Sequence, residues 1–149
     1  MTNEAELLAE AEQDRRDCIG WELEPEASVV FDSADVPERY DLAERTAMFG
    51  ETVIRFAQRI PQSPVTNRLI DQLVGAGTSV GANYCEADEG ISRKDFMHRI
   101  GICKKEARET QFFLRMVVTA QSTLKPEARV VWNEARELKL IFASIFRQR

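Results

Sequence analysis

The side chains best suited to chemistry gather between residues 77 and 110. His98 is the only histidine of the chain. The carboxylates of Glu86, Glu106 and Glu109 resemble metal ligands, but a di-iron bundle needs a Glu-x-x-His motif on each of two helices, and one histidine cannot supply both. No serine lies in a G-x-S-x-G turn, and no group is placed to orient a Cys–His pair. The sequence therefore predicts no catalytic residue, no metal site and no cofactor.

Basic residues dominate the second half of this stretch. Residues 91–115 carry a net charge of +4, from seven bases and three acids. Four of the bases fall on one broad face of a helix by their spacing: Lys94, Lys104, Arg108 and Arg115. Such a ridge attracts phosphate groups, so one interpretation of these bases is contact with a nucleic acid.

A structural alternative for the same bases is pairing with acids inside the bundle. Lys105 and Glu109 lie one helical turn apart, and Lys104 or Arg108 could pair with Glu86 or with Glu44 on a neighbouring helix.

Three further residues point to assembly. Asn83 falls in an apolar stripe, where an amide typically fixes register or association. Gly77 and Gly81 lie one turn apart within the same helical pattern, although each glycine costs a helix about 1 kcal/mol relative to alanine. They predict a groove of small residues in which another helix can approach closely.

The elements that must position these residues are four helices with a heptad spacing of apolar residues. The stripes run over 42–60, 69–87, 96–117 and 128–145. Pro61 and Pro64 are expected to end the first helix, Gly90 to end the second and Ser92 to cap the third, which spans 92–122. Pro126 is expected to open the fourth. Short connections predict an all-α fold, an antiparallel up-down-up-down four-helix bundle over 40–149.

Apolar residues outside these stripes suggest burial between subunits. They are Met97, Ile102, Phe112, Phe113 and Met116.

Residues 1–39 are predicted to be an acidic extension, with a short helix at 3–18 followed by a linker. Residues 1–40 carry a net charge of −9, whereas residues 41–149 carry +4. The extension either keeps the protein soluble or covers a basic surface. It lacks the apolar core of a secretory signal, and no apolar run is long enough to span a membrane, so the sequence predicts a cytoplasmic protein with no membrane partner.

The three cysteines, Cys18, Cys85 and Cys103, fit no zinc-binding pattern. If Cys85 and Cys103 lie on antiparallel helices that meet near Gly90, their heights differ by around 10 Å, which excludes a disulfide. We expect reduced, small core residues.

Four segments together resemble a known family: YDLAERTAMF at 40–49, QLVGAGTSVGANYCEA at 72–87, SRKDFMHRIGICKKEARET at 92–110 and EARELKLIFASI at 134–145. The chain is similar over about 40–147 to the four-helix bundle proteins of the 23S ribosomal RNA intervening-sequence type. The resemblance implies an up-down bundle that assembles into a homopentameric ring with a central channel. Its motif residues here are Arg45, Asn83, Glu86, Lys104, Glu106, Arg108 and Glu109.

Genes of that family lie in insertions of 23S ribosomal RNA genes, which implies RNA as a partner. A related, strongly basic branch, the accessory proteins of diversity-generating retroelements, binds nucleic acid and a reverse transcriptase. The acidic extension and the modest charge of +4 on residues 41–149 depart from that branch. They favour a protein partner or a covered surface.

Two functions follow as hypotheses. The first is a non-enzymatic homo-oligomer, pentameric by resemblance, that binds RNA or an RNA-associated protein through the third helix, with Arg45 as a further contact. The alternative is a protein–protein scaffold in which Gly77, Gly81, Asn83 and the acidic motif residues serve assembly alone.

Overall fold

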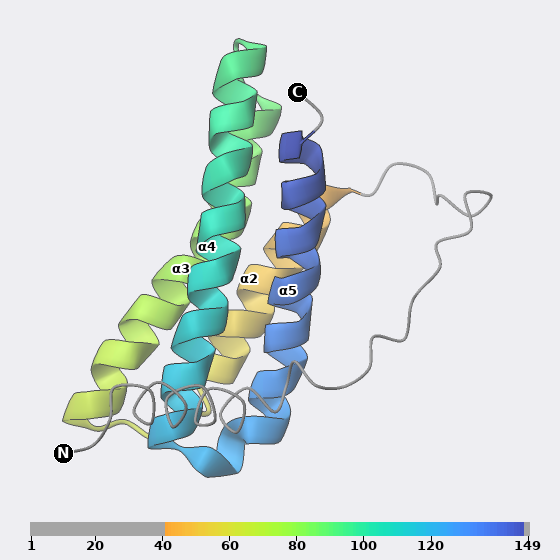
Figure 1. Cartoon of the computed structure of the whole chain (residues 1–149). Coiled ribbons are helices and arrows are strands. Elements are labelled where there is room, and N and C mark those ends of the chain that lie inside the picture. Colours follow the sequence, from red (N-terminus) through yellow and green to blue (C-terminus); the bar gives the residue numbers. More distant parts are fainter. Residues whose placement is uncertain (1–40, 148–149) are drawn as a thin grey trace, which may run out of the picture. The chain divides into compact units, whose positions relative to one another are not determined.

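The computed structural model describes residues 41–147, which form four α-helices and no strand (Figure 1). The elements are α2 (Leu42–Ala57), α3 (Pro64–Asp88), α4 (Arg93–Ala120), a 3-10 turn η1 (Ser122–Leu124) and α5 (Lys125–Arg147). The described part of the chain is therefore the all-α four-helix bundle that the heptad stripes predict. The predicted acidic extension at 1–39, with its helix at 3–18, lies outside the described residues.

Side-chain caps begin three of the helices. Asp41 accepts a hydrogen bond from the amide of Glu44 at 3.2 Å, which satisfies one of the free donors at the start of α2. Ser63 caps α3 in the same way, and Pro64 then occupies the first turn, where its missing N–H costs nothing. The predicted Ser92 cap of α4 is confirmed, since its hydroxyl accepts from the amide of Asp95 at 3.1 Å.

The first helix ends earlier than predicted. Regular α-helix stops at Ala57 rather than at Ile60. The amides of Arg59 and Ile60 instead bond the carbonyls of Phe56 and Ala57 at 3.0 and 3.1 Å, which tightens the last turn before Pro61. Ile60 is still only 3% exposed, so the apolar stripe continues into the core after the helix has ended.

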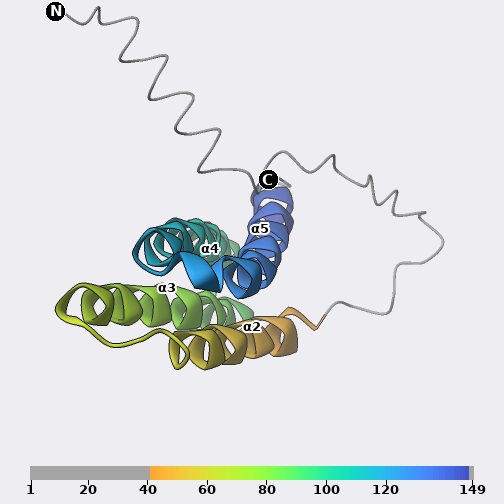
Figure 2. The same cartoon turned by 90° about the horizontal axis from the view of Figure 1, so that it is seen from below.

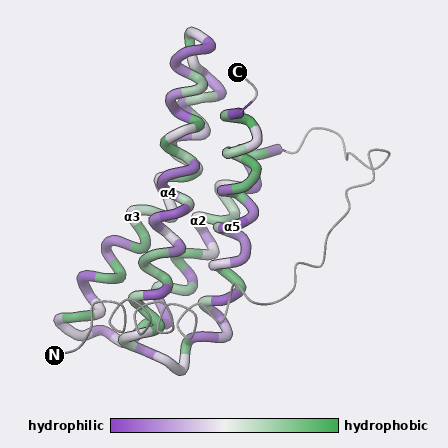
Figure 3. Tube along the Cα trace, viewed as in Figure 1, coloured by the Kyte–Doolittle hydropathy of each residue, from purple (hydrophilic) through white to green (hydrophobic). Residues whose placement is uncertain are grey.

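Each helix packs against the next one in the chain, and α5 returns to contact α2 (Figure 2). The interface between α3 and α4 is the most extensive, and that between α2 and α5 is smaller. Hydrophobic and hydrophilic residues alternate along every helix, as amphipathic stripes require (Figure 3). The stripes supply the buried core, whose largest fully buried side chains include Phe49, Leu73, Ile100, Leu114, Leu138 and Phe142.

Glycines let α2 and α3 approach closely. A Cβ atom at Gly77 would lie 2.7 Å from both Cγ atoms of Val53, and one at Gly81 would lie 3.3 Å from the carbonyl group of Thr46. A Cβ atom at Gly50 of α2 would lie 3.7 Å from the Cα atom of Thr78 on α3. The close approach that Gly77 and Gly81 predict is therefore made by α2 of the same chain.

The α3–α4 hairpin is longer than its neighbours. α3 has 25 residues and α4 has 28, against 16 in α2 and 23 in α5. The tip of the hairpin consequently extends past the C-terminal end of α5 (Figure 1). This overhang and the outer face of α4 carry most of the bases that the sequence singles out.

Candidate nucleic-acid interface

The outer face of α4 is built by the same heptad that fills the core. Ile100, Cys103 and Ala107 are fully buried, so the residues that follow them by one or two positions must point outward. Lys104 and Arg108 occupy such positions and are exposed. The amphipathic pattern of α4 thus both anchors the helix and displays its bases.

The bases predicted to bind a polyanion lie along this helix. Lys94, Lys104 and Arg108 are exposed, and Arg115 is partly buried. None of the four makes an ion pair with another residue of the described range 41–147. Their charges are therefore available to an external anion.

The alternative pairing of these bases is only partly correct. Lys105 and Glu109 do approach, with 3.9 Å between Nζ and Oε1. The predicted pairs of Lys104 or Arg108 with Glu86 or Glu44 do not form within the described residues, because Glu86 accepts from Arg99 instead.

Arg45 lies apart from the α4 bases, at the interface between α2 and α5. Its guanidinium donates to both carboxylate oxygens of Glu134, at 2.7 and 3.1 Å, and to Glu137 at 2.6 Å. The pairing with Glu134 raises the pKa of Arg45 above its already high ordinary value. Two carboxylates neutralise this arginine within the chain, which indicates a structural role rather than the contact with a polyanion that the sequence suggested.

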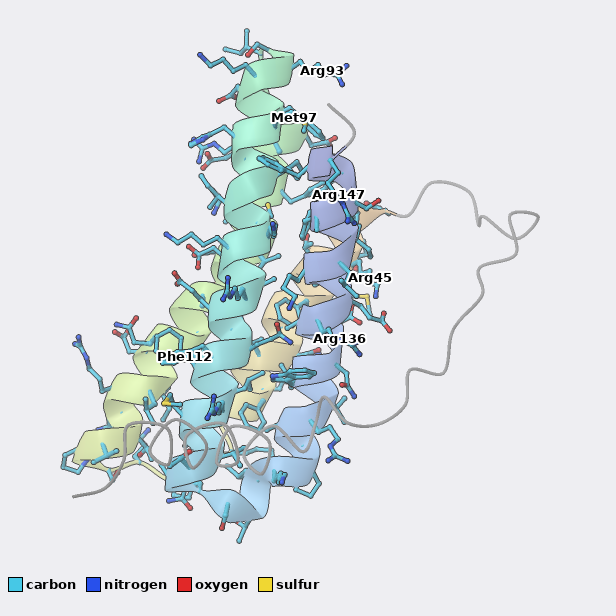
Figure 4. The ribbon with its side chains drawn as sticks, viewed as in Figure 1. Arg45, Arg93, Met97, Phe112, Arg136 and Arg147 are labelled. Carbon is cyan, nitrogen blue, oxygen red and sulfur yellow. The ribbon has the colours of Figure 1, made fainter. Side chains whose placement is uncertain are left out.

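Helix α5 sorts its charges onto different sides. Glu127 accepts from Arg59, in the turn after α2, at 3.0 Å, and Glu134, one heptad later, accepts from Arg45 of α2. Arg129 and Arg136 follow these glutamates by two positions, about 200° around the helix. Figure 4 labels Arg45, which belongs to α2, and Arg136, which belongs to α5. Glutamates of α5 thus form ion pairs with arginines of α2 and of the turn that follows it. Basic residues occupy a different side of α5.

A polar network joins the two helices of the hairpin. Asn83 donates to the carbonyl of Ser79 at 2.8 Å and accepts from Nη1 of Arg99 at 3.1 Å. Arg99 also bonds Glu86, with 2.7 Å between Nη1 and Oε2. The structure thus brings together two of the predicted network residues, Asn83 and Glu86, around an arginine that the sequence reasoning did not place at the site.

A sequence signal for Arg99 does exist. Asn83 lies seven residues before Gly90 and Arg99 nine residues after it, so a hairpin that reverses near Gly90 sets them at similar heights. The network uses the amide to hold the arginine against Glu86.

Glu106 and Glu109 lie outside this network. Glu106 is partly buried, and this burial raises the pKa of its carboxyl group above the ordinary value of 4.5, with a further contribution from the charge of Glu109. Glu109 lies beside Lys105 on the outer face.

The comparison with protein families identifies the chain's relatives. Residues 38–144 match the family described as 23S rRNA-intervening sequence protein. The chain belongs to this family. The match spans all the helices described above except the last turn of α5, so the family resemblance noted from four short segments holds across the bundle.

One solved structure has the same arrangement of helices. It is the crystal structure of a protein with unknown function from the S23 ribosomal protein family of Bacteroides thetaiotaomicron, with 23% sequence identity and a TM-score of 0.63. The likeness covers 72% of this chain and 99% of the other, and at this identity it supports the fold. No curated protein matches the chain.

A groove lies near the overhang of this intervening-sequence family member, between residues of α4 and Phe146 of α5. It has a volume of about 570 Å³ and lies beside α4, where Met97, Gly101 and Phe146 form apolar walls and Lys94 and His98 stand nearby. A Cβ atom at Gly101 would lie 3.3 Å from the Phe146 ring, so this glycine makes room for the ring against α4. The chain's one histidine, His98, thus lines a groove together with Lys94 and Lys105.

The two cysteines of the described range differ. Cys103 is buried, donates to the carbonyl of Val80 at 3.4 Å, and has its pKa raised by burial to about 12. Cys85 is exposed rather than in the core as predicted. Both are free thiols, as the sequence indicated, and Cys18 lies outside the described residues.

Between residues 41 and 147, no three or more histidine, cysteine or acidic side chains are grouped closely enough to hold a metal ion. Within the same range, no helix is both long and apolar enough to cross a lipid bilayer.

Proposed function

We propose that this family member is a non-enzymatic RNA-binding bundle that contacts the phosphates of RNA with the outer face of α4. The observation that carries the proposal is the unpaired state of Lys104 and Arg108 within the described residues, with Arg115 further along the same face. Exposed bases in a row interact with RNA by neutralising phosphates and releasing their counterions.

The distribution of charge supports this assignment. Arg45 and Arg59 are paired with glutamates of α5, so their charges are largely cancelled inside the chain. Lys104, Arg108 and Arg115 of α4 have no such partner within residues 41–147, although the chain contains acids in excess overall. The family description names ribosomal RNA insertions, which agrees with RNA as the polyanion.

Self-assembly is part of the proposal. We infer an up-down-up-down bundle that forms a ring, with five subunits by family resemblance, because the apolar side chains of Val130 and Leu140 on α5 are more than half exposed and residues such as Met97 and Met116 are only partly buried. Light scattering on the full chain should give a mass near five times 17.0 kDa. A mass of 17.0 kDa would contradict the assembly.

The RNA contact is tested by binding of the full chain to a fluorescent structured RNA at about 50 mM salt. Binding is expected, and the double variant Lys104→Ala/Arg108→Ala should weaken it at least about tenfold, since each lost phosphate contact removes counterion release. The matched control is Arg55→Ala/Arg68→Ala, which removes two exposed arginines from α2 and α3.

Two results would contradict the assignment. Absence of binding by the wild-type chain would favour the scaffold alternative, in which the protein assembles and binds other proteins only, among them a reverse-transcriptase-like protein. An equal loss in the control variant would show that net charge, rather than α4, determines the affinity.

A further inference from the structure

A large aromatic side chain lies among the unpaired bases of α4. Phe112 is 53% exposed and is the only aromatic among the large hydrophobic residues that the described range leaves exposed. Figure 4 shows it in the lower part of α4, while Arg93 and Met97 mark the upper end of the same helix. A phenylalanine displayed in this way is accessible to a binding partner.

Two of the four residues that lie one helical turn from Phe112 are cations. Arg108 precedes it by four residues and Arg115 follows it by three, so both lie on the same side of the helix as the ring. Their attachment points are about 10 Å apart along the axis, with the ring between them. Neither arginine has an ion-pair partner within residues 41–147, whereas the nearest acid, Glu109, lies beside Lys105.

The ring is held in place without being covered. Phe113 meets Phe112 in an edge-to-face contact, with ring centroids 5.2 Å apart and an angle of 79° between the planes. Such a contact occupies at most one face of the Phe112 ring. Because Phe112 is 53% exposed, a flat partner can reach the ring.

A flat partner with negative charge on both sides is an unpaired nucleotide within a strand. In an RNA duplex the bases are stacked inside the helix and cannot reach an aromatic side chain, whereas bases of single strands and loops can stack on phenylalanine. We propose that Phe112 is a stacking platform for an unpaired RNA base and that Arg108 and Arg115 bind the phosphates on either side. This inference rests on the proposed RNA binding and narrows its ligand to single-stranded RNA.

The test compares two probes on the full chain: a fluorescent 12-nucleotide oligouridine and a 12-base-pair RNA duplex. Phe112→Leu keeps an apolar side chain but removes the ring, and Phe112→Trp keeps a ring. We expect Phe112→Leu to weaken oligouridine binding about 5- to 150-fold, the usual contribution of one stacked base, while Phe112→Trp retains the affinity. Duplex binding should change less than about twofold in both.

Met48→Leu on α2 is the matched control, because Met48 has a similar exposure of 55%. It should leave both affinities unchanged. Light scattering on Phe112→Leu should show the wild-type mass.

Distinct outcomes separate this inference from the function on which it rests. If the wild type binds RNA but Phe112→Leu binds oligouridine as well as it does, the stacking platform is wrong and the phosphate contact stands. A lower mass for Phe112→Leu would make Phe112 a subunit contact and also overturn the inference. If the wild type binds neither probe, both proposals fail.

Discussion

The α2 side of the bundle and the outer face of α4 use similar side chains in opposite ways. On the α2 side, glycines bring α2 against α3, and two arginines are neutralised by three glutamates of α5. On the outer face of α4, Lys104 and Arg108 have no acid within reach in the described residues, and Phe112 is exposed between bases.

The difference separates side chains that contact other parts of the same chain from side chains that remain accessible to a ligand. Charges that are paired and surfaces that are closely packed contribute to stability. Exposed, unpaired charges contribute little to stability and are available to a ligand. Variants on the two regions should therefore separate effects on unfolding from effects on binding.

The largest effect on stability is expected at the tight α2–α3 contact. Gly77→Ala places a methyl group 2.7 Å from the branched and fully buried Val53 side chain, which should lower the free energy of unfolding by about 1–3 kcal/mol. Gly75→Ala, two residues away, meets nothing within 4 Å and should raise it by about 0.5–1 kcal/mol through helix propensity. Urea unfolding measures both, and a loss of stability in Gly75→Ala would contradict this contrast.

The two regions are compared directly by the stability of the Arg45→Ala and Arg108→Ala variants. Arg45→Ala removes three charge-assisted hydrogen bonds, and we expect a loss of about 1–2 kcal/mol, because solvent screens the partly exposed glutamates. Arg108→Ala should change stability by less than about 0.5 kcal/mol and weaken RNA binding instead. Similar losses of stability in the two variants would show that Arg108 has a structural partner.

Glu106 gives a smaller effect with a defined pH dependence. Burial raises its pKa in the folded state, so the folded chain holds this proton more tightly than the unfolded chain does. Its contribution therefore declines as the pH rises from the unfolded value of 4.5 through the higher folded value. Glu106→Gln should increase the unfolding free energy at pH 7 and leave it unchanged below pH 4. A pH-independent gain would assign the effect to packing.

The reaction of the cysteines with a thiol reagent reports which side of the hairpin is accessible to solvent in the folded protein. In a Cys18→Ser background, Cys85 should react with a thiol reagent such as DTNB in the folded protein, because it is exposed. Cys103 is buried and its pKa is about 12, so its thiol should react only after unfolding. Two equivalents of fast reaction would show that the Val80–Cys103 region opens readily.

Much of the fold is readable from the sequence because burial follows the heptad closely. Val53, Leu73 and Leu114 lie on the predicted stripes and are fully buried. The exception is the end of the first helix, where Ile60 continues the stripe although the helix stops at Ala57. The periodicity reports which side chains are buried, while the hydrogen bonds of the last turn decide where the helix ends.

The partners of the predicted binding residues were less predictable, because ion pairs such as that of Arg45 join distant parts of the chain. Arg45 and Glu134 are 89 residues apart, and no local spacing shows that α5 returns to cover α2. The exposure of Lys104 and Arg108 could be predicted from helical spacing, but the absence of an ion-pair partner for them within residues 41–147 could not. The spacing of Phe112 from Arg108 and Arg115 is readable from the sequence, whereas the 53% exposure of its side chain required the structure.

The most direct test of this account is the salt dependence of RNA binding. For the full chain bound to oligouridine, the slope of the logarithm of affinity against the logarithm of salt concentration should become shallower by about 1.4 in Lys104→Ala/Arg108→Ala, since each phosphate contact on a single strand contributes about 0.7. The slope of Arg55→Ala/Arg68→Ala should equal that of the wild type. Equal slopes in all three proteins would contradict the claim that the outer face of α4 binds RNA.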